Sequence, residues 1–68
     1  MNEDRKRNNL IELRKKRNLT QTQVADAVGI ERSYYTAIEL GKKTPSLKIA
    51  IKLKNVLGYK KDDIFLPL

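Results

Sequence analysis

Two short helical patterns separated by a very tight turn constrain this chain more than any other feature. Residues 21–28 and 32–40 carry apolar side chains at helical spacing, and only three residues separate the two patterns. Thr20 and Gln23 are spaced as a capping box, which predicts where the first helix begins. Gly29 is placed to end that helix, because glycine adopts the left-handed conformation of a helix C-terminus without strain. The pattern predicts two helices packed against each other.

The apolar residues around this turn point toward one small core. They are Val24, Val28, Ile30, Tyr35 and Ile38. Ala25 is small at the place where the second helix has to lie close against the first. Two helices joined by a tight turn that contains glycine form the helix-turn-helix pattern. We therefore predict this motif over about residues 20–41; a helical bundle with a coincidental turn is the alternative.

The rest of the chain also follows helical patterns. We expect a first helix over residues 4–17, a fourth over 47–57 with Ser46 as its N-cap, and a short last helix over 61–66. The apolar inner face expected for the fourth helix consists of Leu47, Ala50, Ile51, Leu53 and Leu57. No strand-like alternation occurs. The sequence predicts a single all-α domain over residues 1–68.

Composition narrows the function classes. Fifteen Lys and Arg against eight Asp and Glu give a formal net charge of +7, which favours a polyanionic partner. The chain contains no His and no Cys, so it lacks the commonest metal ligands, general base and thiol nucleophile. We therefore expect no enzyme activity, metal or cofactor, and no small-molecule ligand is evident. No apolar run reaches the length of a membrane span, roughly 20 residues.

The charges are unevenly distributed along the chain. Residues 20–41 contain a single cation, Arg32, whereas the other fourteen lie in two flanking blocks, 5–17 and 42–61. On DNA, phosphate contacts position a protein and a few side chains read the bases. A weakly charged segment that reads bases, flanked by cationic segments that contact phosphates, fits this division of roles.

At this point the sequence resembles the phage repressor and Cro-type helix-turn-helix proteins, the XRE-like regulators. The resemblance runs from about Leu10 to Phe65. It is carried by Leu10–Leu13, Leu19-Thr20-Gln21, Val24-Ala25, Gly29-Ile30, Ile38-Glu39, Gly41-Lys42, Pro45-Ser46-Leu47, Leu57-Gly58 and Asp63-Ile64-Phe65. It implies a compact five-helix, lambda-repressor-like domain. The implied function is sequence-specific binding of double-stranded DNA by a small transcriptional regulator, usually a repressor.

The resemblance also implies residue roles. Base reading falls to the start of the recognition helix, at Glu31, Arg32, Ser33, Thr36 and Ala37. Phosphate contacts fall to Gln21, Lys42 and Lys43, and an internal ion pair to Arg14 and Glu39. The residues themselves suggest that Tyr34 either bonds a phosphate or covers the edge of the core. Arg32 is disfavoured at a helix N-terminus by the dipole, so a DNA-facing role explains it better than a solvated surface position.

Four positions depart from the family pattern. Lys54 stands where a small apolar residue is common, Lys60 stands at the usual cap of the last helix, and the other two belong to the recognition helix. Glu31 stands at the expected N-cap of the recognition helix, where glutamate is a poor cap, so this helix start is either frayed or used to accept from a cytosine N4 amino group. Ala37 replaces a longer polar residue, which reduces base reading there to contact with a thymine methyl group.

A homodimer on a palindromic operator is expected, because one recognition helix covers too few base pairs for a specific site. The predicted dimer interface is the apolar surplus of the fourth helix and the chain end: Ile49, Val56, Phe65, Leu66 and Leu68. A protein–protein adaptor module is the alternative function, and an amphipathic membrane-surface protein is a weaker one. As a regulator, the protein would work in the cytoplasm on the nucleoid of a prokaryotic cell, encoded by a phage, plasmid or chromosome.

Overall fold

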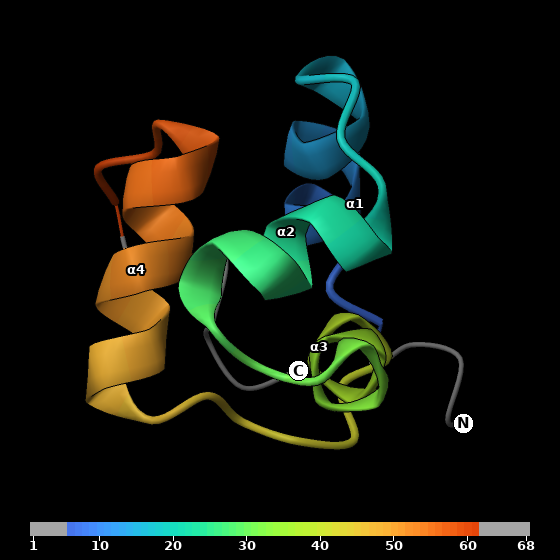
Figure 1. Cartoon of the computed structure of the whole chain (residues 1–68). Helices are drawn as coiled ribbons and strands as arrows, with labels where there is room; N and C mark the ends of the chain where they lie inside the picture. Colours follow the sequence, from blue (N-terminus) through green and yellow to red (C-terminus); the bar gives the residue numbers. More distant parts are fainter. Residues whose placement is uncertain (1–5, 62–68) are drawn as a thin grey trace.

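A computed structural model describes residues 6–61 of the chain, and the regular elements of the described part are all helices, without a strand (Figure 1). Its four helices are α1 (Asn8–Lys16), α2 (Gln21–Val28), α3 (Arg32–Glu39) and α4 (Leu47–Leu57). The all-α class and the pair of short helices are confirmed. The five-helix count has no support in the described part, because the helix predicted over 61–66 lies almost wholly outside it and Lys61 is not helical.

The start and end of α2 follow from local side-chain chemistry. Thr20 Oγ1 accepts from the backbone N–H of Gln23 at 3.0 Å, and Gln23 Oε1 accepts from the N–H of Thr20 at 2.8 Å. This predicted capping box satisfies two N–H groups that a helix start leaves unpaired. At the other end Gly29 has φ +78°, in the left-handed region where glycine is unstrained. The chain can therefore turn at once into α3.

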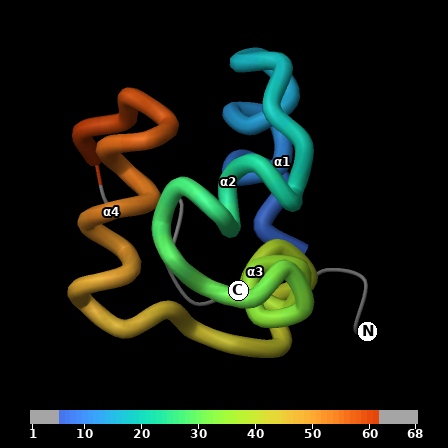
Figure 2. Tube along the Cα trace, viewed as in Figure 1, coloured from blue at the N-terminus to red at the C-terminus, as the bar shows by residue number. Residues whose placement is uncertain are grey.

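The core lies where the helices meet around α2. α2 packs against both α3 and α4, and α1 contacts α3. Figure 2 shows α1 and α4 on opposite sides of the molecule, with α2 between them and α3 below. The fully buried apolar residues are Leu10, Val24, Ala25, Val28, Tyr35, Ile38, Leu53 and Leu57. Every one of the motif's predicted core residues is buried here or, for Ile30, packs against this cluster.

The first helix is shorter than predicted. It begins at Asn8, whereas the sequence pattern predicted a helix already in progress at Lys6 and Arg7. Arg7 has φ −85° and ψ 77°, which is not helical, and its side chain does not cap α1. Its backbone N–H instead donates to the carbonyl of Glu39 in α3 at 2.8 Å. A tertiary contact therefore replaces the first turn of the predicted helix.

The predicted inner face of α4 is wrong in part. Leu47 and Ile51, assigned to the core, are 78% and 49% exposed. Ile49 and Val56, assigned to a surplus outside the core, are half-buried and pack against it. The helix has apolar residues on most of its sides, so the pattern alone could not say which side faces α2. Its predicted limits are confirmed, with Ser46 Oγ accepting from the N–H of Ile49 at 3.3 Å.

Candidate nucleic-acid interface

The start of α3 is the exposed end of this helix. Glu31, Arg32 and Ser33 are exposed, and one turn further on Thr36 is half-buried. These four residues line one open hollow of about 470 Å³. Ala37, the fifth predicted base-facing residue, is half-buried and does not line this hollow. In Figure 1 α3 is seen nearly end-on, beneath α2.

Glu31 is the N-cap of α3 but makes no side-chain cap hydrogen bond. The prediction that it is a poor cap is confirmed. Its backbone is nevertheless extended, with φ −67° and ψ 145°, as an N-cap residue requires. The first N–H groups of α3 therefore receive no acceptor from Glu31 and remain available to water or to an anion.

Gln21 links the two helices of the motif. Its Nε2 donates to Glu39 Oε1 at 2.9 Å, and its Oε1 accepts from the Thr36 hydroxyl at 2.8 Å. These two bonds leave the second amide hydrogen of Gln21 without a partner among the described residues. Because Thr36 donates its only hydroxyl hydrogen to Gln21, it can offer a ligand just its oxygen lone pairs and its methyl group. This link was not evident from the sequence, which assigned Gln21 and Thr36 separate roles.

Arg14 on α1 and Glu39 at the end of α3 form a short ion pair. Arg14 Nε donates to Glu39 Oε2 at 2.6 Å, and Arg14 Nη1 donates to the carbonyl of Leu19 at 2.9 Å. The side chains are 12% and 3% exposed, so the pair is largely removed from water. Burial acts to raise the pKa of Glu39, but the hydrogen bonds from Arg14 and Gln21 outweigh it and hold the pKa below its ordinary value. The carboxylate therefore stays charged.

The two tyrosines of α3 differ in their surroundings. Tyr35 is fully buried, and its hydroxyl lies by the Arg14–Glu39 pair. Burial raises the pKa of Tyr35 far above its ordinary value, and among the described residues this hydroxyl has no well-formed hydrogen bond. Tyr34 is half-buried and packs against the core. Its partial exposure is compatible with both roles considered for it.

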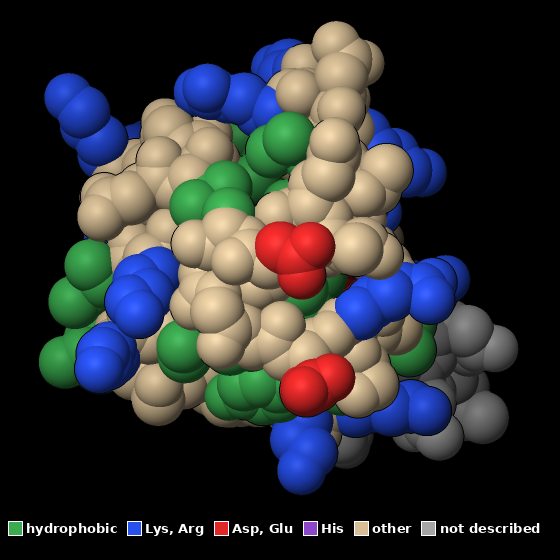
Figure 3. Space-filling model, viewed as in Figure 1, with side chains coloured by type: hydrophobic (Ala, Val, Ile, Leu, Met, Phe, Trp, Pro, Cys, Tyr) green, Lys and Arg blue, Asp and Glu red, His purple; other side chains and the backbone are tan. Residues whose placement is uncertain are grey.

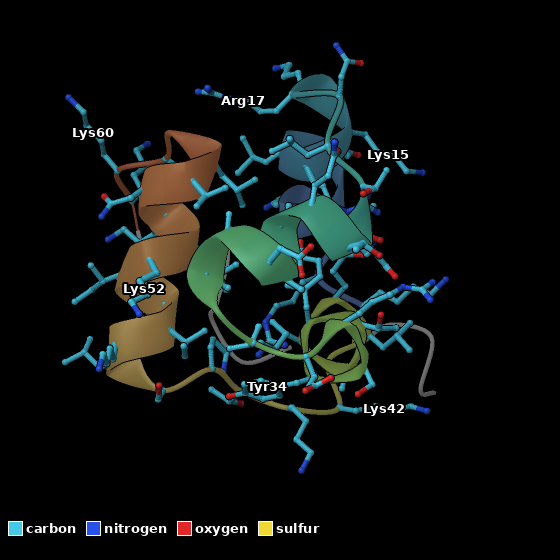
Figure 4. The ribbon with its side chains drawn as sticks, in the orientation of Figure 1. Lys15, Arg17, Tyr34, Lys42, Lys52 and Lys60 are labelled. Carbon is cyan, nitrogen blue, oxygen red and sulfur yellow. The ribbon has the colours of Figure 1, made fainter. Side chains whose placement is uncertain are left out.

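Lys42 and Lys43 lie three and four residues beyond the end of α3 and are exposed. The backbone N–H groups of both donate to the carbonyl of Ala37, at 2.9 and 3.2 Å, so their backbone is folded back onto the helix. Figure 4 shows the Lys42 side chain pointing away from the body of the protein. Two cations are thus held beside the end of the candidate reading helix.

A second open hollow, of about 420 Å³, lies between the end of α1 and the start of α2. Lys15, Gln21 and Arg32 are among the residues that line it. It combines cationic side chains with the N-terminal end of a helix, a combination that suits a phosphate group. In Figure 3 Lys and Arg side chains lie mainly around the edge of the molecule, while the central part of this face carries acidic side chains among uncharged ones.

Sequence reasoning missed Arg7. It belongs to the cationic block at residues 5–17, whose members were treated together, yet it is only 5% exposed and bonds to the end of α3. Nothing in its neighbouring residues separates it from the exposed cations around it. Its role depends on contacts with residues more than thirty positions away in the sequence.

Comparisons with known proteins agree with the helix-turn-helix motif formed by α2 and α3. The helix-turn-helix family profile matches residues 10–64. The chain is 42% identical over 60 residues to an uncharacterized HTH-type transcriptional regulator of Archaeoglobus fulgidus, covering 88% of this chain and 84% of the relative. It is 47% identical over 49 residues to one of Methanocaldococcus jannaschii, covering 72% and 74%. A Bacillus subtilis regulator is 44% identical over 54 residues, 79% of this chain but only 47% of that protein.

These matches place the chain in a class of DNA-binding transcription regulators, which is not a class of enzymes. The chain belongs to the XRE-type helix-turn-helix family. Its partner is double-stranded DNA. No solved structure shows significant similarity to it. Within residues 6–61, no helix is long and apolar enough to cross a membrane and no acidic cluster could hold a metal ion.

Proposed function

We propose that this protein reads a specific DNA sequence with the start of α3 and acts as a transcriptional repressor. The observation that carries the proposal is the shared hollow lined by Glu31, Arg32, Ser33 and Thr36. Side chains that read bases have to converge on one patch that enters the major groove. In this proposal the bound protein represses by occupying DNA that the transcription machinery needs.

Each side chain of the hollow has a definite recognition chemistry. Arg32 donates to O6 and N7 of guanine through its forked guanidinium group, and Glu31 accepts from N4 of cytosine. Ser33 can donate or accept. Thr36 accepts from an amino group or packs its methyl group on a thymine, since its own hydrogen is held by Gln21. Ala37, just outside the hollow, is limited to a thymine methyl group.

Phosphate contacts come from around this patch. The residues proposed for them are Gln21, Tyr34, Lys42 and Lys43. Lys42 and Lys43 are exposed beyond the end of α3, and Gln21 opens α2 with one amide hydrogen unused. Contacts on both sides of the reading helix would fix its register on the duplex without carrying sequence information.

Selection of binding sites from random duplexes tests sequence reading directly. The wild type should enrich one motif, and Arg32→Ala should weaken binding to it by about 1–3 kcal/mol and relax the preference at one base pair. Arg17→Ala is the matched control, because Arg17 is exposed and lies outside the hollow. It removes the same charge and should leave the preferred motif unchanged. An unaltered motif with Arg32→Ala would contradict its role as a base reader.

We further propose that two copies act together on a palindromic operator, with half-sites about 34 Å apart. The exposed Leu47 and Ile51 give α4 an apolar side that the domain core does not cover. Ile49 and Val56 lie on a different side of the helix and are partly covered by the core. The other proposed interface residues, Phe65, Leu66 and Leu68, lie outside the described residues. Sedimentation equilibrium with and without operator DNA is the test. A protein that stays monomeric at high micromolar concentration in both conditions would exclude the dimer.

The source of the relatives supports a prokaryotic setting, because they come from archaea and bacteria. The operator would then lie on the nucleoid in the cytoplasm. The adaptor alternative predicts no enrichment in the selection, so the same experiment separates it from the regulator.

A further inference from the structure

Arg7 is buried although it precedes the first helix and carries a full charge. It is 5% exposed, whereas the adjacent Lys6 is exposed. Arginine side chains are almost never this deeply buried unless their donors are engaged. Specific contacts have to offset the free-energy cost of removing this cation from water.

Those contacts converge on the C-terminal end of α3 and on the segment after it. Arg7 Nη1 donates to the carbonyl of Ile38 at 2.6 Å and to the carbonyl of Lys43 at 3.0 Å. The backbone N–H of Arg7 donates to the carbonyl of Glu39 at 2.8 Å. The last carbonyls of a helix have no partner within the helix. Arg7 provides a donor for the carbonyl of Glu39 and a second donor for that of Ile38, which also accepts from the N–H of Gly41 at 3.1 Å.

Electrostatics favours this position. The C-terminal end of a helix carries partial negative charge, which a nearby cation stabilises. Burial lowers the pKa of Arg7, but an arginine keeps its proton at every physiological pH. Its Nε atom is buried and has no hydrogen-bond partner among the described residues. Arg7 therefore makes its side-chain hydrogen bonds through Nη1 alone among the described residues. This one nitrogen bridges α3 and the segment after it.

That bridge fixes the backbone that carries the two exposed lysines. From one side Lys42 and Lys43 donate their N–H groups to the carbonyl of Ala37. From the other side Arg7 holds the carbonyl of Lys43. The lysine backbone is thus tied both to α3 and to the segment before α1, while the lysine side chains stay exposed.

We infer that Arg7 is a positioning residue for DNA binding, which sets the Lys42–Lys43 segment against the phosphate backbone by bridging Ile38 and Lys43. This inference rests on the proposed phosphate role of the two lysines. Arg7 does not touch DNA itself, because its side chain is buried. A purely structural cap would stabilise the fold without affecting how many phosphates the protein engages, and this difference makes the two roles separable.

The salt dependence of binding to duplex DNA counts the phosphate contacts, because each lost contact lowers the slope of log K against log salt by about 1. Arg7→Met should lower the slope by about 1 to 2, although it alters no exposed contact. In a Lys42→Ala, Lys43→Ala background the same change should lower it no further. Arg7→Lys, which keeps a charged donor that can reach carbonyls, should restore most of the slope. Lys6→Met removes an exposed neighbouring charge and should have the same effect in both backgrounds.

Amide hydrogen exchange in the free protein provides a readout that needs no DNA. Arg7→Met should accelerate exchange of the Lys42 and Lys43 amides by about tenfold or more relative to core amides of α2, and Lys6→Met should not. Faster exchange together with DNA binding that does not depend on salt in any variant would mean that Arg7 orders the segment but that the lysines do not bind phosphate. The proposed phosphate role of the two lysines would then be wrong. An unchanged slope in Arg7→Met, or equal losses in both lysine backgrounds, would overturn the positioning role. If Arg7→Met does not fold, a wild-type slope and exchange pattern in Arg7→Gln would overturn it, because glutamine is too short to bridge both carbonyls.

Discussion

The two ends of α3 are built in opposite ways. At its C-terminal end Arg7 binds the carbonyls of Ile38 and Glu39, and the Glu39 carboxylate is held by Arg14. At its N-terminal end Glu31 makes no cap and the first side chains stand in the open. The C-terminal end is bonded to the segment before α1 and to α1 itself. The N-terminal end receives no hydrogen bond from its cap residue.

This difference separates the end of α3 that holds the helix in place from the end that carries the proposed base-reading residues. In the proposed mode of DNA binding α3 has to be held at a fixed angle. The buried ion pair and the Arg7 bridge hold its C-terminal end. The proposed base-reading residues Glu31, Arg32 and Ser33 lie at the other end, where they are exposed and Glu31 makes no cap hydrogen bond. Changes to the Arg14–Glu39 pair at the anchored end should therefore lower stability, and changes to Arg7 should also lower the number of phosphate contacts. Arg32→Ala at the other end should instead alter the base preference.

The largest expected effect comes from breaking the anchored end. Glu39→Gln and Arg14→Met each leave the opposite charge buried without its partner, which typically costs about 3–5 kcal/mol. Chemical denaturation followed by circular dichroism gives the loss in free energy of unfolding. Glu12→Gln is the matched control, because Glu12 is exposed on α1 and should change stability by less than about 0.5 kcal/mol. Losses below about 1 kcal/mol in both core variants would mean that the pair does not anchor α3.

A smaller effect of the same pair should appear on acidification. The pKa of Glu39 is lower in the folded protein than in the unfolded chain, so the unfolded state binds its proton more readily. The contribution of Glu39 is therefore complete above the unfolded pKa, about 4.3, and is lost as the pH falls through the lowered folded value. Unfolding measured from pH 7 to pH 3 should show this decline. Glu39→Gln should flatten it, and an equal decline in that variant would assign the acid sensitivity to other carboxylates.

Local signals were sufficient to predict the helix-turn-helix itself. The limits of α2 follow from Thr20, Gln23 and Gly29, which lie next to the groups that they satisfy. The spacing of apolar residues then identifies the core side of both motif helices, because each has one apolar stripe. Features whose cause lies within one or two turns of sequence are readable from sequence.

The anchored end was not readable in the same way. The burial of Arg7 depends on α3, far along the chain, and a run of cations looks solvated in sequence. The interior bonds of Gln21 required a side-chain geometry that only packing sets. In α4 the exposure of Leu47 and Ile51 was missed because apolar residues occupy most sides of that helix, and contact with α2 decides which side is buried.

The smallest expected effect comes from making the reading end resemble the start of α2. Glu31 already has the extended backbone of an N-cap, so in Glu31→Ser the introduced hydroxyl can accept from the N–H of Tyr34, as Thr20 accepts from Gln23. Such a cap is worth about 1 kcal/mol, but the variant also loses a carboxylate that the helix dipole favours by about 0.3–1 kcal/mol. We expect a net gain of about 0.5 kcal/mol or less in the free energy of unfolding.

Salt separates the two contributions, because the dipole term is screened and the cap is not. The gain from Glu31→Ser should therefore grow between low salt and about 1 M salt, where the Debye length is only about 3 Å. Thr20→Ala is the matched comparison at the other helix start and should cost about 1 kcal/mol at both salt concentrations. A Glu31→Ser protein that is no more stable than wild type at high salt would show that the start of α3 is already satisfied. The two ends of the helix would then differ less than their hydrogen bonds indicate.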